Sequence, residues 1–152
     1  MFKLLHVLFV VFGIGFIIGP GFIVHRIVHS KDVRAIRTGL RIMIPLGKAG
    51  PPLMMAGAIM GLVAAYVGSY NFLAPWLIAT YIIFITMVIL GAAFHDPWLK
   101  RVLTAAEASP DDQMSPALQE AVNTPKGGQI VVFAAPVAIM TFVILMVLKP
   151  FN

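Results

Sequence analysis

The sequence predicts an all-α, polytopic membrane protein: a bundle of four transmembrane helices with short surface helices on the cytoplasmic side. Hydrophobic residues make up 60% of the 152-residue chain, only 11% of its residues are charged, and its mean hydropathy is +0.95. A soluble domain has about a quarter of its residues charged. Four apolar segments come close to the roughly 20 residues that a helix needs to cross a bilayer. The polar segments between them are too short to fold alone, so we expect residues 1–152 to form a single integral membrane domain.

The first crossing covers Leu4–Val24, and His6 is its only ionisable side chain. A cleaved signal peptide is the alternative interpretation of this segment. Its apolar run is longer than the core of about 7–15 residues that a signal peptide has, and no small-residue cleavage site follows it. We therefore expect a retained transmembrane helix.

The next segment carries six of the eleven Lys and Arg residues of the chain. Ser30 can cap a short helix here, and the helix has two distinct faces. Arg34, Arg37 and Arg41 share the basic face, and Val33, Ile36, Leu40 and Met43 share the apolar face. This pattern is typical of a helix that lies flat on a membrane and contacts anionic lipid headgroups. The simpler alternative is a basic segment that only fixes the orientation of the chain.

The second crossing is predicted at about residues 51–67, beginning at Pro51-Pro52. A start nearer Ile42 is also open and would bring Lys48 into the interface. The short turn 68–71 makes the second and third crossings a hairpin. Aromatic side chains of the kind that gather at membrane interfaces flank this turn: Tyr66, Tyr70 and Trp76.

The third crossing is predicted at about residues 73–94. Asp96 as N-cap and Pro97 at the first helical position predict a new helix after it, with Trp98 as an interfacial anchor. Ser115-Pro116 predicts the start of a second short helix.

The last crossing is predicted at residues 130–148, after the Thr124–Gly128 segment has reset the chain. Nine of the Lys and Arg residues lie in the two long connections, and only Lys3 and Lys149 lie on the opposite side. Because cytoplasmic loops carry the excess of basic residues, we expect both termini outside the cytoplasm.

Two glycine pairs with four-residue spacing occur within the crossings: Gly15 with Gly19, and Gly57 with Gly61. Such pairs let helix backbones approach closely. They predict the packing faces of the first and second helices, either within the chain or with a partner.

Three of the four histidines fall at the cytoplasmic ends of the first and third crossings. His25 and His29 have the i, i+4 spacing by which one helix offers two imidazoles to a metal, and His95 can complete such a site. The alternative interpretation is three interfacial histidines near lipid headgroups.

His6 is the remaining candidate for a site, because an ionisable group at membrane depth costs free energy. It can be an axial haem ligand or a metal ligand, and methionine is a possible second haem ligand. The alternative is a buried hydrogen bond from His6 to a backbone carbonyl or a tyrosine. Since no other histidine lies at this depth, a cofactor here needs a second ligand of another residue type or from another chain.

The sequence lacks the residues that several classes of function require. The chain has no cysteine, which excludes disulfides and iron–sulfur clusters. All six acidic residues lie in the two long loops, so the crossings contain no carboxylate relay for a proton-coupled transporter. The sequence shows no pairing of a nucleophile with a base, so an enzyme is not the favoured interpretation.

Three features together resemble an uncharacterised bacterial family of predicted four-helix integral membrane proteins, a domain of unknown function. They are the four-crossing layout with a basic first loop, the opening Phe2-Lys3-Leu4-Leu5-His6-Val7 and the ending Leu145-Met146-Val147-Leu148-Lys149-Pro150. That family is distantly similar to the copper-resistance D proteins and to the haem-binding membrane protoporphyrinogen oxidase. The resemblance implies a bacterial inner membrane and matches His6 to the functional histidine of those relatives. The oxidase also uses a lysine within a later crossing, which residues 73–94 lack, so the resemblance does not extend to oxidase activity.

We expect a small membrane accessory subunit or scaffold that packs against other membrane subunits or a second copy of itself. The alternatives are a haem b or porphyrin-handling redox protein that uses His6, and a protein that handles copper or another metal through His25, His29 and His95. The basic residues lie between apolar runs, which favours anionic lipids and not nucleic acid as their partner.

Overall fold

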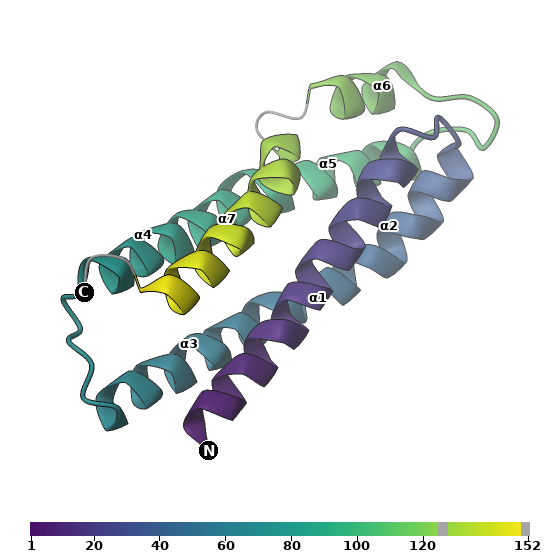
Figure 1. Cartoon of the computed structure of the whole chain (residues 1–152). Helices are drawn as coiled ribbons and strands as arrows, with labels where there is room; N and C mark the ends of the chain where they lie inside the picture. The colour runs from purple at the N-terminus through teal and green to yellow at the C-terminus, as the bar shows by residue number, and fades with distance from the viewer. Residues whose placement is uncertain (125–127, 150–152) are drawn as a thin grey trace.

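The computed structural model describes residues 1–124 and 128–149, and every element in that part of the chain is a helix (Figure 1). In chain order the elements are α1 (Phe2–Val28), α2 (Val33–Gly47), α3 (Gly50–Val67), α4 (Pro75–Leu90), the π-helical turn η1 (Gly91–His95), α5 (Asp96–Glu107), α6 (Pro116–Asn123) and α7 (Gly128–Leu148). Residues 125–127, within the segment expected to reset the chain, and Pro150 of the terminal motif lie outside the described residues.

Four helical stretches are long and apolar enough to cross a membrane: Phe2–Val28, Val33–Val67, Pro75–Glu107 and Ile130–Leu148. The all-α class with four candidate crossings is therefore confirmed. The last stretch agrees with its predicted bounds, whereas the first three extend beyond theirs. The additional turns lie at the end of the molecule where α2, α5 and α6 gather (Figure 1).

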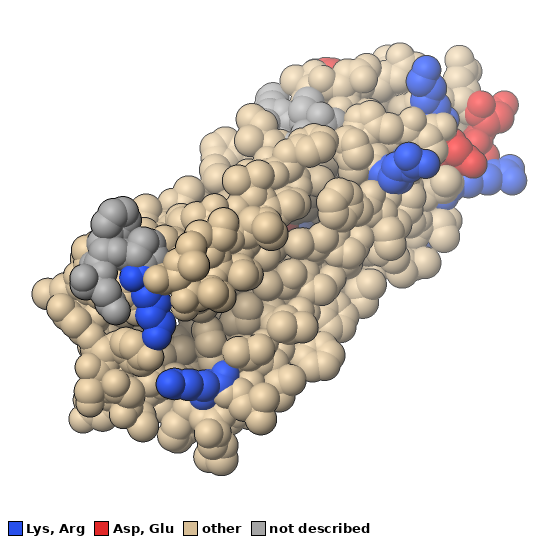
Figure 2. Space-filling view, viewed as in Figure 1, with Lys and Arg blue, Asp and Glu red and all other residues tan. Residues whose placement is uncertain are grey.

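The long helices form two pairs. α1 packs along α3, which is the most extensive helix contact of the fold, and α4 packs along α7 (Figure 1). The α1–α3 pair and the α4–α7 pair contact each other mainly through α1 and α7. Side chains on the outer surfaces of these helices are apolar and exposed, and charged residues gather at the two ends of the face that Figure 2 shows. A wide uncharged band between charged ends is what a membrane-embedded protein needs.

Glycines let α1 and α3 approach closely. A Cβ on Gly57 would lie 2.9 Å from Cγ2 of Val10, and one on Gly61 would lie 2.8 Å from Nδ1 of His6. The structure therefore places this glycine pair in the packing face of α3. On α1 the close contact is made by Gly13, whose Cβ would lie 2.8 Å from Cγ of Met54.

Gly15 and Gly19 differ from these positions, because a Cβ on either would meet no atom of a neighbouring element within 4 Å in the described part of the chain. They do not form the α1–α3 contact. Their packing against a partner, which the sequence left open, stays a prediction.

An apolar core closes the end of the molecule where α1 meets α2, α5 and α6. This loop-end core comprises Val24, Val28, Val33, Ile36, Leu40, Trp98, Leu99, Val102, Ala106, Leu118 and Val122. The centre of this core is closed to solvent, because Ile36 and Leu40 have no exposed surface. The apolar face of α2 is thus buried against protein, and the prediction that α2 lies flat on the membrane is wrong. The apolar face of an amphipathic helix can be buried either in a membrane or against protein. In this fold α1 and α5 pack against the apolar face of α2.

Trp98 belongs to this core and is not an interfacial anchor, which corrects the prediction from the sequence. Its side chain is fully buried, and its indole nitrogen donates a 3.1 Å hydrogen bond to the Ala121 carbonyl. Gly128 lies against the ring, where a Cβ would come within 2.7 Å. The membrane interface suits tryptophan because it offers an apolar region for the ring and a hydrogen-bond partner for the N–H group. Trp98 has both inside the protein.

Of the three starts predicted for the short helices, at Ser30, Asp96 and Ser115, only the one at Ser115 agrees with the structure. Ser115 caps α6 by accepting a hydrogen bond from the Leu118 amide at 3.2 Å, as predicted. For α2 the cap is Asp32, which accepts from the Ala35 amide at 3.0 Å. Ser30 instead donates to the Ile27 carbonyl at the end of α1.

The predicted break before Pro97 is absent. α4 continues through η1 into α5, and Asp96 makes no capping hydrogen bond with its side chain. Its backbone amide bonds to the Gly91 carbonyl, five residues earlier, which is the π-helical pattern. Because proline lacks an amide donor, one widened turn lets the helix pass Pro97 without ending.

Candidate functional site

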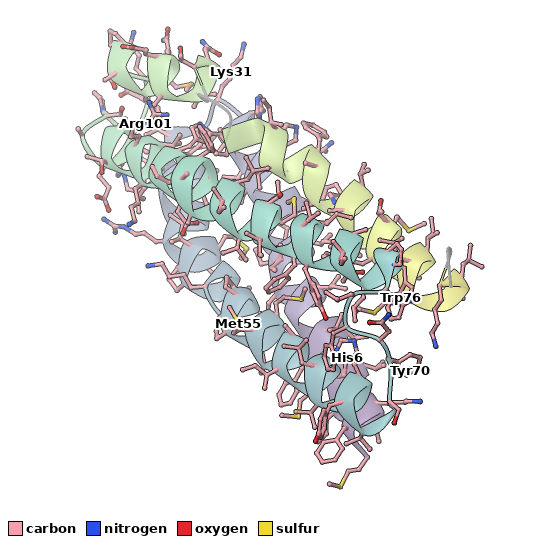
Figure 3. The ribbon with its side chains drawn as sticks, turned by 90° about the vertical axis from the view of Figure 1, so that its left-hand side faces the viewer. His6, Lys31, Met55, Tyr70, Trp76 and Arg101 are labelled. Atoms are coloured by element: carbon pink, nitrogen blue, oxygen red, sulfur yellow. The ribbon has the colours of Figure 1, made fainter. Side chains whose placement is uncertain are left out.

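His6 joins α1 to α3. Its Nδ1 donates a 2.7 Å hydrogen bond to the Gly57 carbonyl, and its ring rests against Gly61. Figure 3 shows the side chain between the two helices, at the same end of the molecule as Tyr70 and Trp76. This is the hydrogen bond to a backbone carbonyl that the sequence left open as an alternative, and it is part-buried. Because a carbonyl can only accept, the neutral ring carries its proton on Nδ1, and Nε2 keeps its lone pair.

The three histidines at the other end do not assemble into a metal site. The rings of His25 and His29 are 4.5 Å apart, but no group of three or more His, Cys, Asp or Glu side chains in the described chain could hold a metal ion. His95 bonds through Nδ1 to the Gly128 carbonyl at 3.2 Å, and the His25 ring contacts Phe133 edge-on. The prediction of a three-histidine site is therefore wrong. Helix α7 packs against both α1 and η1, and it provides the partners of His25 and His95.

The three arginines of α2 have partners within the chain. Arg37 donates to the Ala106 carbonyl at 3.0 and 3.2 Å, to the Ser109 carbonyl at 2.8 Å and to the Asp111 carboxylate at 2.8 Å. It thereby satisfies carbonyls at the end of α5, where a positive charge also meets the favourable end of the helix dipole. Arg37 is mostly engaged in this fold contact, with a side chain only 23% exposed.

The two other arginines are more open. Arg34 pairs with Asp111 at 3.1 Å and Arg41 with Glu107 at 2.8 Å. The hydrogen bond from Arg37, together with the charges of Arg34 and Arg37, holds the pKa of the Asp111 carboxyl below its ordinary value. Contact of these arginines with lipid headgroups stays a prediction.

At the end near His6, Lys149 donates a 2.8 Å hydrogen bond to the Tyr70 hydroxyl and lies 4.3 Å from the centre of its ring. Lys3 lies 5.8 Å from the same ring. The hydrogen bond and the charge of Lys149 lower the pKa of the Tyr70 phenol. Trp76 packs edge-on against Tyr70 and is buried, so of the predicted aromatic belt Tyr66 is the fully exposed member.

A cavity of about 370 Å³ lies between the α1–α3 pair and the α4–α7 pair. Its walls are apolar side chains from these four helices, and methionines from three elements contribute: Met43 of α2, Met54 and Met55 of α3, and Met87 of α4. The volume falls in the range of small-molecule sites, about 300–1,000 Å³. Sequence periodicity does not indicate such a space, because it depends on how far apart two helix pairs settle.

Four polar residues line this cavity: Lys48, His95, Asp96 and Lys100. Lys48 follows the last residue of α2, whereas the other three lie at the junction of η1 with α5. The two lysines and Asp96 are exposed, and no ion pair among the described residues involves them. The cavity therefore has apolar walls that include a few charged residues.

No family model matches this chain, and neither a curated protein nor a solved structure is similar to it. The resemblance to the bacterial four-helix family therefore stays a prediction, and the functional argument depends on the geometry.

Proposed function

We propose that this chain is a small, non-enzymatic accessory subunit of a membrane protein complex, and that its α1 helix packs against a helix of a partner subunit or of a second copy. The observation that carries the proposal is the open pair Gly15 and Gly19. In the part of the chain that the structure describes, no neighbouring element comes within 4 Å of a Cβ placed on either glycine.

The outward face of α1 has the shape of a docking surface for a helix. Phe12 and Phe22 flank the two glycines and are 59% and 53% exposed. Small residues between large ones let a second helix backbone come close, which favours association inside a bilayer. The glycine pair of α3 serves as a comparison within the same chain, because it receives α1 side chains in this way.

The accompanying location is the bacterial inner membrane, with both termini outside the cytoplasm and with α2, α5 and α6 inside. The distribution of Lys and Arg supports this orientation.

The test is the size of the native complex extracted from membranes in mild detergent. We expect the wild-type chain in a complex larger than a monomer, and the double variant Gly15→Leu/Gly19→Leu as a monomer. Gly21→Leu is the matched control, because a Cβ there also meets no atom of another described element within 4 Å, but Gly21 lies on the cavity side of α1, away from Gly15 and Gly19. Disulfide formation by Phe12→Cys between two chains would identify a second copy as the partner. A monomeric wild type, or a double variant that keeps the complex, contradicts the proposal.

The second candidate function is binding of haem b through His6, and one observation favours it. The Nδ1 bond to the Gly57 carbonyl fixes the tautomer of the neutral ring so that Nε2 carries the lone pair, as in histidines that ligate metals through Nε2. The other three histidines lie near the opposite end of the chain's long helices, so a second axial ligand must come from another residue type or another chain. A Soret band in the purified protein that His6→Ala abolishes supports this candidate, and a colourless, metal-free preparation contradicts it.

A further inference from the structure

The cavity between the two helix pairs has the polarity and depth of a lipid site. We propose that it binds one anionic phospholipid from the adjoining leaflet, with an acyl chain between the helix pairs and the phosphate at Lys48 and Lys100. Gly15 and Gly19 of the proposed partner surface do not line this cavity, although Phe22 borders both, so variants of the glycines and of the lysines let the two proposals fail separately.

The depth of the cavity matches one leaflet. Its lining runs from Ile14 to Val24 along α1 and from Val131 to Phe142 along α7. At 1.5 Å of rise per residue these stretches are about 15–17 Å long. The hydrocarbon core of a bilayer is about 30 Å thick, so the cavity spans about half of it.

The lining carries a net positive charge. Lys48 and Lys100 come from different helices and line the same cavity, and neither takes part in an ion pair among the described residues. Asp96 is the one carboxylate in the lining. Two ammonium groups against one carboxylate favour a net negative headgroup over a zwitterionic one.

The walls suit an acyl chain. Apart from the four polar residues, the lining side chains are hydrocarbon, thioether or aromatic, and no buried polar atom without a partner belongs to a lining residue. Methionines such as Met54 and Met87 have flexible side chains that adapt to the shape of a ligand. A flexible hydrocarbon is therefore a better occupant than a rigid molecule that needs specific hydrogen bonds.

The test is lipid retention. Full-length protein is reconstituted in nanodiscs of equal parts phosphatidylglycerol and phosphatidylethanolamine, released into mild detergent, and examined by native mass spectrometry. We expect one phosphatidylglycerol per chain. Lys48→Ala/Lys100→Ala should lower its retention roughly tenfold or more, since each basic group near an anionic headgroup contributes appreciably to binding.

Matched variants separate the cavity from general surface charge. Arg101→Ala removes the cation next to Lys100 on the same helix but outside the cavity lining, and it should retain lipid as the wild type does. Gly21→Leu adds a side chain to the lining and should also lower retention, while Gly15→Leu should not.

Equal retention of the two lipids overturns the proposal. So does an equal loss in Lys100→Ala and Arg101→Ala. Circular dichroism spectra and melting curves establish that each variant is folded, and the exposed lysines keep the test decisive if Gly21→Leu is not.

Discussion

Arg37 shows how one side chain connects two elements. It replaces water at the end of α5 by bonding two carbonyls and a carboxylate at once. Hydrogen bonds that involve a charged group contribute about 1.5–3 kcal/mol, and their loss leaves partly buried carbonyls unsatisfied.

We therefore expect Arg37→Ala to lower the free energy of unfolding by about 2–3 kcal/mol, measured by denaturant unfolding in detergent micelles. Arg34→Ala is the control. Arg34 bonds the same Asp111 but is 73% exposed, and an exposed ion pair is worth at most about 1 kcal/mol. Equal losses in the two variants would show that the carbonyl contacts of Arg37 contribute nothing.

The contact between Arg37 and Asp111 makes the stability of the fold depend on pH. Because the hydrogen bond from Arg37 holds the pKa of Asp111 in the folded protein below the unfolded value of 3.8, the ionised carboxylate stabilises the fold at higher pH. This contribution is fully present above the unfolded pKa and is lost as the pH falls through the lower folded pKa. We expect the wild-type unfolding midpoint to fall more steeply than that of Asp111→Asn between about pH 5 and pH 3. Parallel curves would contradict the assignment.

The individual residues explain what the sequence could predict and what it could not. The hydrogen bond of His6 to a carbonyl was among the alternatives, because a buried imidazole needs a partner. The burial of Trp98 was not predicted, since a tryptophan beside an apolar run looks the same at an interface and in a core. Only the position of α6, whose Ala121 carbonyl accepts its indole proton, distinguishes the two.

At the scale of elements, apolar runs located the four candidate crossings, but the ends of the helices depended on tertiary contacts. α2 has the pattern of a surface helix, yet α1 and α5 cover its apolar face. Asp96-Pro97 has the pattern of a helix start, yet η1 carries the helix past it. In both cases the local pattern is compatible with two structures, and contacts distant in sequence select one.

The glycine pairs provide the test of helix packing. Gly57→Ala places a Cβ 2.9 Å from Val10 and 3.3 Å from its backbone nitrogen, so α1 must move away from α3. We expect a loss of about 1–3 kcal/mol in unfolding free energy, as for other overpacked contacts. Gly15→Ala meets no atom and should be neutral or stabilising by up to about 1 kcal/mol, because alanine favours the helix. Destabilisation of the purified monomer by both would contradict the packing of α1 on α3.

At the scale of the whole molecule, the two helix pairs are held together differently at their two ends. The loop-end core joins α1 and α2 to α5 and α6. At the other end a second, smaller cluster around Trp76 and Leu77 packs with Tyr70 and Leu145. The cavity lies between the pairs and reaches Val24 and Leu99 of the loop-end core. The two clusters hold the helix pairs together at their ends, and the proposed lipid site lies between them.

The orientation in the membrane decides which leaflet supplies the proposed lipid, and the chain is well suited to measuring it. It contains no cysteine, so each single-cysteine variant reports one position. Lys31 and Ser69 are both exposed. Lys31 follows the last turn of α1 and Ser69 follows the last turn of α3, and these two helix ends lie at opposite ends of the molecule (Figure 1). In intact cells we expect a membrane-impermeant maleimide to label Ser69→Cys, and to label Lys31→Cys only after the membrane is opened. Labelling of both after opening is the control for access. The reverse pattern in intact cells would contradict the proposed orientation, and it would place Lys48 and Lys100 at the outer leaflet. The lipid would then have to come from the outer leaflet, whereas the cavity and its charges would be unchanged.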